Sequence, residues 1–195
     1  MFITQVDKLT KALIDRKIIT VDNRETVNYG LSTGVELILN LITTLTIGFV
    51  LNMLLESIVF VLSFAYIRVY AGGYHLKKAL NCYLASNGIV VLVLLTVKMT
   101  PKEYMVSISF ILLAISIPII LKFAPMGTTN KSLSNYEKEY FRKKVMSYMI
   151  IELIIIFILL LLDIGILVLL MSLGIFISSL LITVSVYKQE IIFDT

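Results

Sequence analysis

The chain has few charges, one cysteine and one histidine, and these shortages exclude several classes of protein. Only 15% of its 195 residues are charged, against roughly a quarter in an ordinary soluble domain. With Cys82 as its single cysteine it forms no internal disulfide. Cys82 and the single histidine, His75, are too few ligands for a zinc site, because no carboxylates are suitably spaced to join them. We therefore expect no metal, no other cofactor and no nucleic-acid partner.

Apolar residues are abundant instead. They make up 58% of the chain, and the mean hydropathy is +0.96. This composition predicts an all-α, multi-pass membrane protein with about six spans and a single membrane domain over 1–195. The segment 54–67 is shorter than the about 20 residues that cross a bilayer, and it and 83–98 could be half-inserted. The six apolar segments are 31–50, 54–67, 83–98, 104–122, 146–162 and 164–186.

Positive charge falls on one side of these predicted spans. If the amino terminus is cytoplasmic, all but Lys98 and Lys102 of the 17 lysines and arginines lie on the cytoplasmic side. The positive-inside rule therefore predicts this orientation. Both termini, the segment 68–82 and the basic loop 123–145 would then face the cytoplasm.

Two stretches outside the spans have amphipathic helical patterns. Residues 1–25 include apolar positions three and four apart, with charges between them, which suits a helix on the cytoplasmic face of the membrane or one packed on the protein. Ser134 and Glu137 form a capping-box pattern, and Glu139 and Lys143 are spaced to pair on one helix face. A second helix is therefore expected to run directly into the fifth span.

The segment 68–82 contains the residues best suited to chemistry. The Cys82 thiol and the His75 imidazole are the minimal parts of a cysteine nucleophile. In one continuous helix their Cα atoms would lie roughly 10 Å apart along the axis, so a reacting pair requires a bend. Gly72–Gly73 permits a tight turn or a close approach to another backbone. We expect the second span to end near Tyr70, followed by a broken or re-entrant segment that carries His75 and Cys82.

Electrostatics set conditions on such a nucleophile. Partial burial disfavours a thiolate, whereas positive charge from Arg68, Lys77 and Lys78 favours it, and His75 is placed to act as a base. Taken separately, a lone cysteine is most often a small buried hydrophobe and a lone histidine an interfacial residue. A third, orienting group stays open among Asn81, Asn87, Ser86, Ser63, Glu36 and Asn40.

Two acids lie well inside predicted spans. Glu36 and Glu152 are functional candidates, because a charge is unfavourable at that depth. The alternative is a hydrogen bond from a protonated acid to a neighbouring helix.

The string Arg68-Val-Tyr-Ala-Gly-Gly-Tyr-His75 with its seven-residue step to Cys82 resembles the accessory gene regulator B (AgrB) family, membrane-embedded cysteine endopeptidases of bacterial peptide quorum sensing. The strings Glu36-Leu-Ile-Leu-Asn40, Phe60-Val-Leu-Ser-Phe64 and Ala124-Pro125 fit as well. The resemblance implies that Cys82 is the nucleophile and His75 its base. It places Arg68, Gly72 and Gly73 at supporting positions.

The same resemblance implies a substrate and a location. The substrate would be an AgrD-like propeptide in the bacterial cell membrane, cleaved at its acidic C-terminal tail through a thioester and cyclised to a thiolactone or lactone. The cationic side chains would contact this tail, or else act as topology signals and contacts to membrane lipid. A homodimer is compatible with the resemblance. The weaker candidates for substrate binding are Lys77, Lys78, Arg142, Lys143, Lys144 and Glu36.

Two other functions are compatible with the composition. In a small membrane exporter, or in a non-catalytic assembly or sensor subunit for a peptide, His75 and Cys82 would merely pack. No nucleotide-binding loop or inverted repeat supports an exporter. A non-catalytic subunit predicts that Cys82→Ser has no effect.

Overall fold

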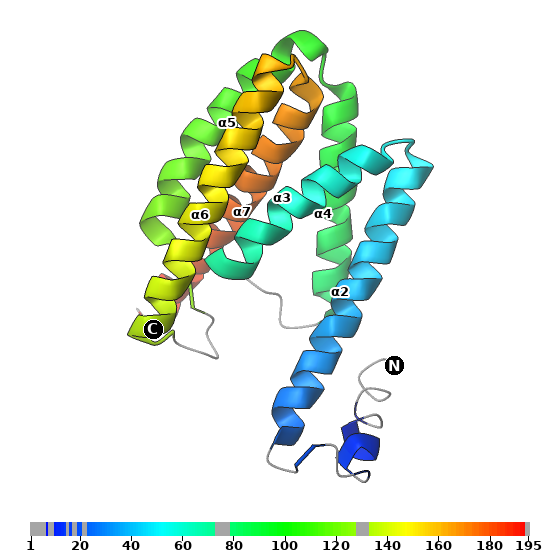
Figure 1. Cartoon of the computed structure of the whole chain (residues 1–195), viewed down its shortest axis with the longest axis vertical. Helices are drawn as coiled ribbons and strands as arrows, with labels where there is room; N and C mark the ends of the chain where they lie inside the picture. Colours follow the sequence, from blue (N-terminus) through cyan, green and yellow to red (C-terminus); the bar gives the residue numbers. More distant parts are fainter. Residues whose placement is uncertain are drawn as a thin grey trace.

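A computed structural model describes residues 7, 10–14, 16, 19–20, 23–72, 79–127 and 133–193. Six long helices account for most of them, and the described part of the chain includes no strand, which confirms the all-α class (Figure 1). The helices are α2 (Arg24–Val50), α3 (Leu54–Ala71), α4 (Ala79–Met99), α5 (Lys102–Phe123), α6 (Asn135–Leu161) and α7 (Gly165–Phe193).

Each of these helices is long and apolar enough to cross a membrane. The second and third predicted spans were too short. The helix α3 continues to Ala71, and its 18 residues reach about 27 Å, close to the ~30 Å thickness of the hydrocarbon core. The helix α4 begins at Ala79 and has 21 residues. The chain is therefore a multi-pass membrane protein with six candidate spans.

The helix α7 is the centre of the bundle. It packs against α3, α4, α5 and α6. In an apolar stretch of 18 residues of α7, 61% of the positions are buried, against 11% in the corresponding stretch of α2. Lipid tails are as apolar as leucine, so membrane helices associate through close packing rather than hydrophobic exclusion. Gly174 permits that packing, because a Cβ there would lie 2.6 Å from the Ser63 Oγ atom of α3. A larger residue would push α3 away from the central helix.

A buried acid lies on α6. Glu152 is only 5% exposed, and its Oε2 atom has no hydrogen-bond partner among the described residues. The Ser63 hydroxyl of α3 donates to the Met171 carbonyl of α7, at 3.1 Å. Both interpretations of Glu152, a functional residue and a hydrogen bond between helices, stay predictions.

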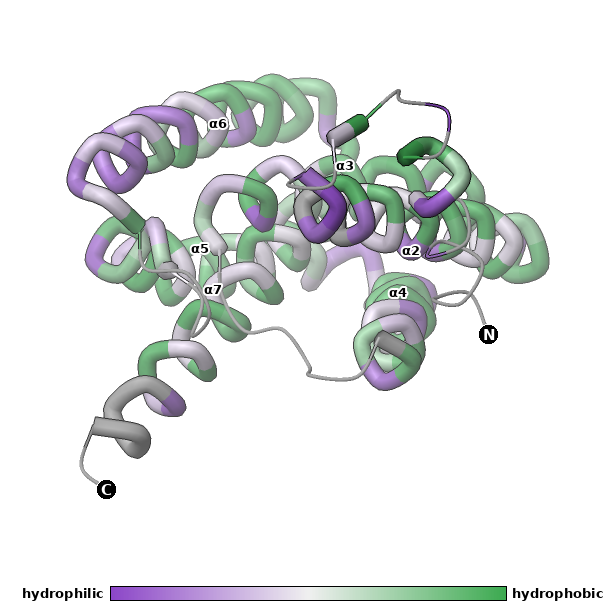
Figure 2. Tube along the Cα trace, turned by 90° about the horizontal axis from the view of Figure 1, so that it is seen from below, coloured by the Kyte–Doolittle hydropathy of each residue, from purple (hydrophilic) through white to green (hydrophobic). Residues whose placement is uncertain are grey.

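The helix α6 begins outside the apolar region, as expected. Ser134 caps it, with the Ser134 hydroxyl accepting from the Glu137 N–H while the Glu137 side chain accepts from the Ser134 N–H. The predicted pair of Lys143 and Glu139 is present, at 2.7 Å. The tube in Figure 2 is hydrophilic over the first turns of α6 and hydrophobic over the later ones. The predicted helix that runs directly into the fifth span is confirmed.

The described part of the amino-terminal stretch packs against the start of α2. Thr10 is fully buried and donates to the Asn28 Oδ1 atom, at 3.3 Å. Asp7 pairs with Arg24 at 3.0 Å and with Lys11 at 3.2 Å, and these two cations hold the pKa of Asp7 below its ordinary value. Residues 10–14 are helical, and much of the predicted helix over 1–25 lies outside the described residues.

Candidate functional site

The predicted interruption between the second and third helices begins at Gly72. The helix α3 ends one residue earlier, at Ala71, close to the predicted end near Tyr70. Cys82 lies in the first turn of α4, half-buried, so the expectation that the broken segment would include it was wrong. The apolar segment in the sequence starts at residue 83, but the helix α4 also includes the more polar residues just before it. Of the predicted site residues, Gly73, His75, Lys77 and Lys78 lie outside the described residues.

Gly72 has a backbone conformation that only glycine adopts readily. Its φ and ψ angles are +70° and −146°, a combination that places the Cβ of an L-residue in steric conflict. A Cβ at this position would also lie 2.2 Å from the Met126 carbonyl oxygen. The Met126 N–H donates to the Ala71 carbonyl, at 2.8 Å, so the loop after α5 is held against the end of α3. The predicted close approach of another backbone is thus present at Gly72.

Arg68 contacts this turn from within α3. Its guanidinium donates to the Gly72 carbonyl across the end of α3. Cys82 lies on a separate helix, in the first turn of α4. Positive charge near a thiol favours the thiolate, which is the nucleophilic form of cysteine.

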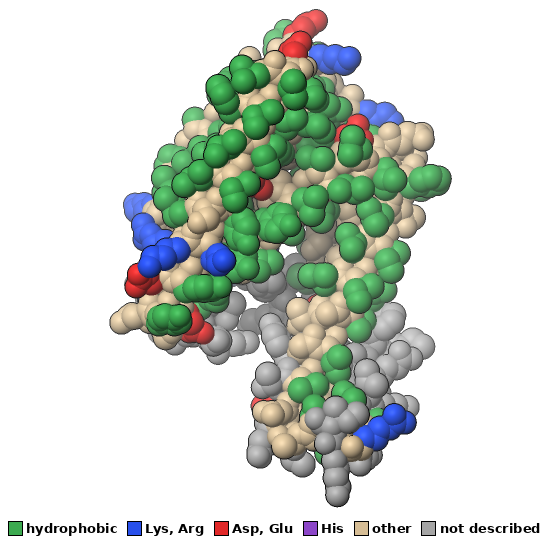
Figure 3. All heavy atoms as spheres, viewed as in Figure 1, with side chains coloured by type: hydrophobic (Ala, Val, Ile, Leu, Met, Phe, Trp, Pro, Cys, Tyr) green, Lys and Arg blue, Asp and Glu red, His purple; other side chains and the backbone are tan. Residues whose placement is uncertain are grey.

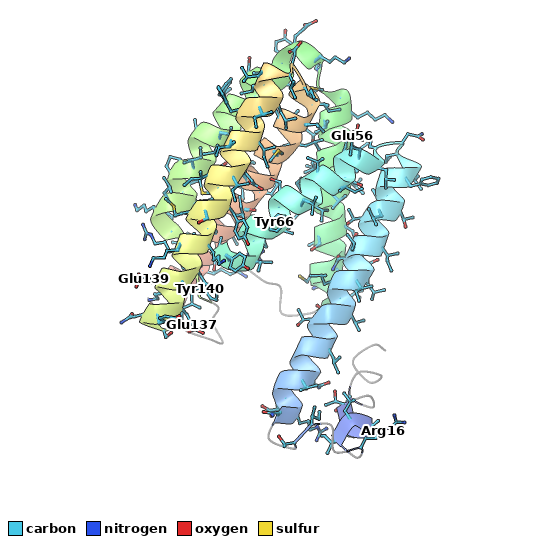
Figure 4. All side chains as sticks on the ribbon, viewed as in Figure 1. Arg16, Glu56, Tyr66, Glu137, Glu139 and Tyr140 are labelled. Carbon is cyan, nitrogen blue, oxygen red and sulfur yellow. The ribbon has the colours of Figure 1, made fainter. Side chains whose placement is uncertain are left out.

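Aromatic residues fix the same end of α3 against α6. The Tyr70 ring stacks on Tyr148 with centroids 5.2 Å apart, and Tyr148 also stacks on Tyr66, at 5.3 Å. Phe141 lies 6.2 Å from Tyr70. Figure 4 shows Tyr66 on α3 and Tyr140 on the first half of α6. This cluster was not predicted, although the aromatic residues of 60–70 and 136–148 lie at the ends of spans where they could meet.

Several candidates for a third catalytic group have other partners. Asn87 of α4 donates to the Asn40 Oδ1 atom of α2, at 3.1 Å, and to the Tyr83 carbonyl, at 2.8 Å. Ser63 donates to the Met171 carbonyl of α7. The structure thus gives these three candidates interhelical contacts. Asn81 is exposed and Ser86 half-buried on α4.

The basic residues at the start of α6 form a surface cluster with local contacts. Arg142 donates weakly to the Leu121 carbonyl at the end of α5, at 3.4 Å, and Lys144 lies over the Tyr140 ring, at 5.7 Å. Lys143 pairs with Glu139. In Figure 3 the blue side chains of this region gather on the surface of α6. Glu36, the other weak candidate, lies half-buried on α2, one turn before Asn40.

Sequence reasoning missed the loop residues that hold the turn. Met126 supplies both backbone contacts to the end of α3, and its side chain type has no part in them. The available signal was topological, because the second and fourth spans end on the same side of the membrane. Together these residues place a single thiol, a guanidinium and a glycine-dependent turn at one end of the bundle. Such an arrangement suits nucleophilic attack on a carbonyl carbon.

Comparison with known proteins shows the family that this chain resembles. Residues 6–186 match the family model described as accessory gene regulator B. An AgrB-like protein 2 of Clostridium perfringens (strain 13 / Type A) is 27% identical over 63% of this chain and 60% of its own length. An AgrB-like protein of C. perfringens (strain SM101 / Type A) is 28% identical over 71% and 69%. The accessory gene regulator protein B of Staphylococcus aureus (strain MW2) is 31% identical over 55% and 56%.

The alignments with the first and third of these relatives thus span less than two thirds of the relative's length. No solved structure matches the chain. The family model, in contrast, covers nearly all of the sequence and includes the whole segment from Arg68 to Cys82. The chain belongs to the accessory gene regulator B family.

Proposed function

We propose that this protein is a membrane-embedded cysteine endopeptidase that removes the C-terminal tail of an AgrD-like propeptide and promotes its cyclisation. The observation that carries the proposal is the position of Cys82 in the first turn of α4, at the end of the bundle where α3 ends in the Gly72 turn that Arg68 contacts. Family membership and the presence of a single thiol in the chain support it. His75, which lies outside the described residues, is the proposed base.

The proposed reaction has two acyl-transfer steps. The Cys82 sulfur attacks a substrate peptide carbonyl, the C–N bond breaks, and the expelled amine of the tail takes the proton that His75 removed from the thiol. The propeptide fragment is then held on Cys82 as a thioester. A cysteine or serine within that fragment attacks the thioester, closes the ring and releases the Cys82 thiol.

A membrane location favours cyclisation over hydrolysis. Water competes with the internal nucleophile for the thioester, and a site at the membrane surface keeps water sparse. Holding the two ends of the fragment together raises their effective concentration. The distribution of lysines and arginines favours an orientation with the site and both termini in the cytoplasm, because nearly all of these cations lie on that side of the spans.

Loss of either proposed catalytic residue is expected to leave the propeptide uncleaved. Cys82→Ala removes the nucleophile, and His75→Ala removes the base, so coexpression of either variant with the propeptide should yield full-length propeptide. Cys82→Ala should still bind the propeptide in a pull-down, because it retains the rest of the site. Immunoblotting of both chains measures processing and membrane insertion together. Cleavage that persists in Cys82→Ala contradicts the proposal.

The basic cluster on α6 is the proposed contact for the acidic tail. Replacing Arg142, Lys143 and Lys144 together with glutamine removes three cations, and exposed charge pairs are each worth roughly 0.2–1 kcal/mol. We expect propeptide binding about tenfold weaker, with normal insertion and with a steeper loss for the more acidic tails. A titration of membranes with labelled propeptide measures the change. If binding and processing are unaltered, these residues act only as topology signals or as contacts to membrane lipid.

A further inference from the structure

The inward side of α4 changes from polar to apolar along its length. Near the start of the helix, four residues with hydrogen-bonding side chains share an arc of about 140°. All four are buried or half-buried: Cys82, Tyr83, Ser86 and Asn87. Further along, the same arc is apolar and packed into the core, which fixes this part of α4, through Val90, Val93, Leu94 and Val97. The polar stretch is therefore confined to the part of α4 that carries the thiol.

Asn87 lies furthest into the helix of these four residues and has an unused acceptor. Only 8% of the residue is exposed. Its Nδ2 atom donates to the Asn40 Oδ1 atom of α2, at 3.1 Å, and to the Tyr83 carbonyl, at 2.8 Å. Its Oδ1 atom is buried and has no hydrogen-bond partner within the described part of the chain. An unpaired acceptor is unfavourable in a membrane span, so a contact between helices does not by itself account for this side chain.

The neighbouring helix α2 presents polar groups at the same place. The Thr43 and Tyr83 hydroxyls are 2.6 Å apart. The Asn40 Nδ2 atom donates to the Glu36 carbonyl of its own helix, at 3.0 Å, which leaves the Asn40 Oδ1 atom to accept from Asn87. Polar side chains inside spans often mark a substrate pathway. We call these residues, Asn40 and Thr43 of α2 with Tyr83 and Asn87 of α4, the polar seam.

The first half of α2 has no buried residue to hold it against the bundle. None of its described residues before Thr44 is buried, and in Figure 1 this half extends away from α5, α6 and α7. Close packing lies in the second half, where a Cβ added to Gly48 would overlap Ser57 of α3. Movement of the first half of α2 would therefore open the polar seam while α4 keeps its contacts with the core.

We propose that the polar seam binds the main chain of the propeptide, with a peptide group of the substrate replacing Asn40 as the partner of Asn87. A carboxamide is complementary to a peptide group, because its oxygen accepts from the N–H and its NH2 group donates to the carbonyl. The replacement also gives the Asn87 Oδ1 atom the donor that it lacks.

The spacing along α4 sets which peptide group this is. Asn87 lies about 7.5 Å beyond Cys82 along the helix axis, and an extended peptide advances about 3.3 Å per residue. The bound peptide group is therefore about two residues from the bond that is cleaved. The inference rests on the proposed function in taking the propeptide as substrate and Cys82 as the nucleophile.

Binding of labelled propeptide to the Cys82→Ala chain in lipid nanodiscs tests the polar seam without cleavage. Adding Asn40→Leu and Asn87→Leu together replaces both partners by apolar side chains of similar size, a change that is close to neutral for stability. Insertion and thermal stability should therefore stay near those of the Cys82→Ala chain. The dissociation constant should rise about threefold to tenfold, which is the strength of one hydrogen bond.

Thr96→Val is the matched control on the same helix. Thr96 is exposed, and its hydroxyl donates to the Leu92 carbonyl of its own helix. In the Cys82→Ala chain this substitution should leave the dissociation constant unchanged.

Ester substitutions in the propeptide test the same contact from the substrate side. Replacing one amide by an ester removes a single N–H and keeps the extended shape. One ester within three residues of the cleaved bond should weaken binding to the Cys82→Ala chain about threefold to tenfold. The same ester should have no further effect when Asn40 and Asn87 are both replaced by leucine, because the two changes delete one contact. The ester series on the Cys82→Ala chain decides the question even if the leucine variant does not insert.

Three results would overturn the inference. They are unchanged binding by the leucine variant, an ester effect of equal size in both proteins, and an ester series without effect on the Cys82→Ala chain. Each would assign the polar seam to contacts between helices alone. Absence of propeptide binding to the Cys82→Ala chain would contradict both proposals. Cleavage that persists in Cys82→Ala contradicts only the proposed function, since the binding data still decide whether the polar seam holds the peptide.

Discussion

Gly72→Ala is expected to lower propeptide cleavage at least 100-fold while the chain still inserts into the membrane. The alanine Cβ would lie 2.2 Å from the Met126 carbonyl oxygen, a backbone atom that no side-chain rotation can move. The φ and ψ angles of Gly72 add strain of about 1–3 kcal/mol for any other residue. The end of α3 would have to separate from the loop after α5, and Arg68, which donates to the Gly72 carbonyl, would move with it. Cleavage by membranes containing equal amounts of each variant measures the loss.

Gly88→Ala is the matched control for that substitution. Gly88 lies on α4, where an added Cβ would have open space around it, with no neighbouring atom within 4 Å. Alanine also has a higher helix propensity than glycine. This variant should insert and cleave as wild type does. Wild-type cleavage by Gly72→Ala would show that the contact between Gly72 and Met126 is not needed by the site.

Arg68→Gln is expected to slow both alkylation of Cys82 and cleavage by about tenfold to 100-fold. The substitution removes a cation at the end of the bundle that carries Cys82, and with it positive charge that would stabilise the sulfur anion formed during attack. It also removes the planar donor that reaches the Gly72 carbonyl. Arg68→Lys keeps the charge but not the planar donor. Its rates should lie between those of wild type and Arg68→Gln, because arginine and lysine are not interchangeable at such sites.

The measurement for Arg68 combines two rates. Iodoacetamide modification reports on the thiol, and propeptide cleavage reports on the whole reaction. Slower cleavage with unchanged alkylation would assign Arg68 to substrate binding instead. Unchanged rates of both kinds would contradict a role for Arg68 in the site.

The spans were predictable because each one is a long apolar run in which the composition differs from that of its flanks. Their ends were less predictable. The run 83–98 omits the first turn of α4, since Asn81 and Cys82 are compatible with either a helix or an irregular segment. Tertiary contacts decide between them, and the two hydrogen bonds that join Tyr83 and Asn87 of α4 to α2 are contacts of this kind.

The site was predictable in its residues but not in its contacts. Gly72 could be assigned a tight turn or a close backbone approach from residue type alone. Its partner, Met126, could not be identified, because the pairing uses only the Met126 backbone and joins residues far apart in the sequence. The pairing of Asn40 with Asn87 was equally hidden. A polar residue in a predicted span signals a partner in the membrane, but the sequence does not say on which helix it lies.

The central claim is that Cys82 carries the propeptide fragment as a thioester, and intact-mass spectrometry tests it directly. Wild-type protein mixed with propeptide and quenched in acid should gain the mass of the fragment without its tail. Neutral hydroxylamine should remove that mass, and peptide mapping should place it on Cys82. Cleavage of the propeptide that proceeds with no adduct on Cys82, or with an adduct on another residue, would contradict the account.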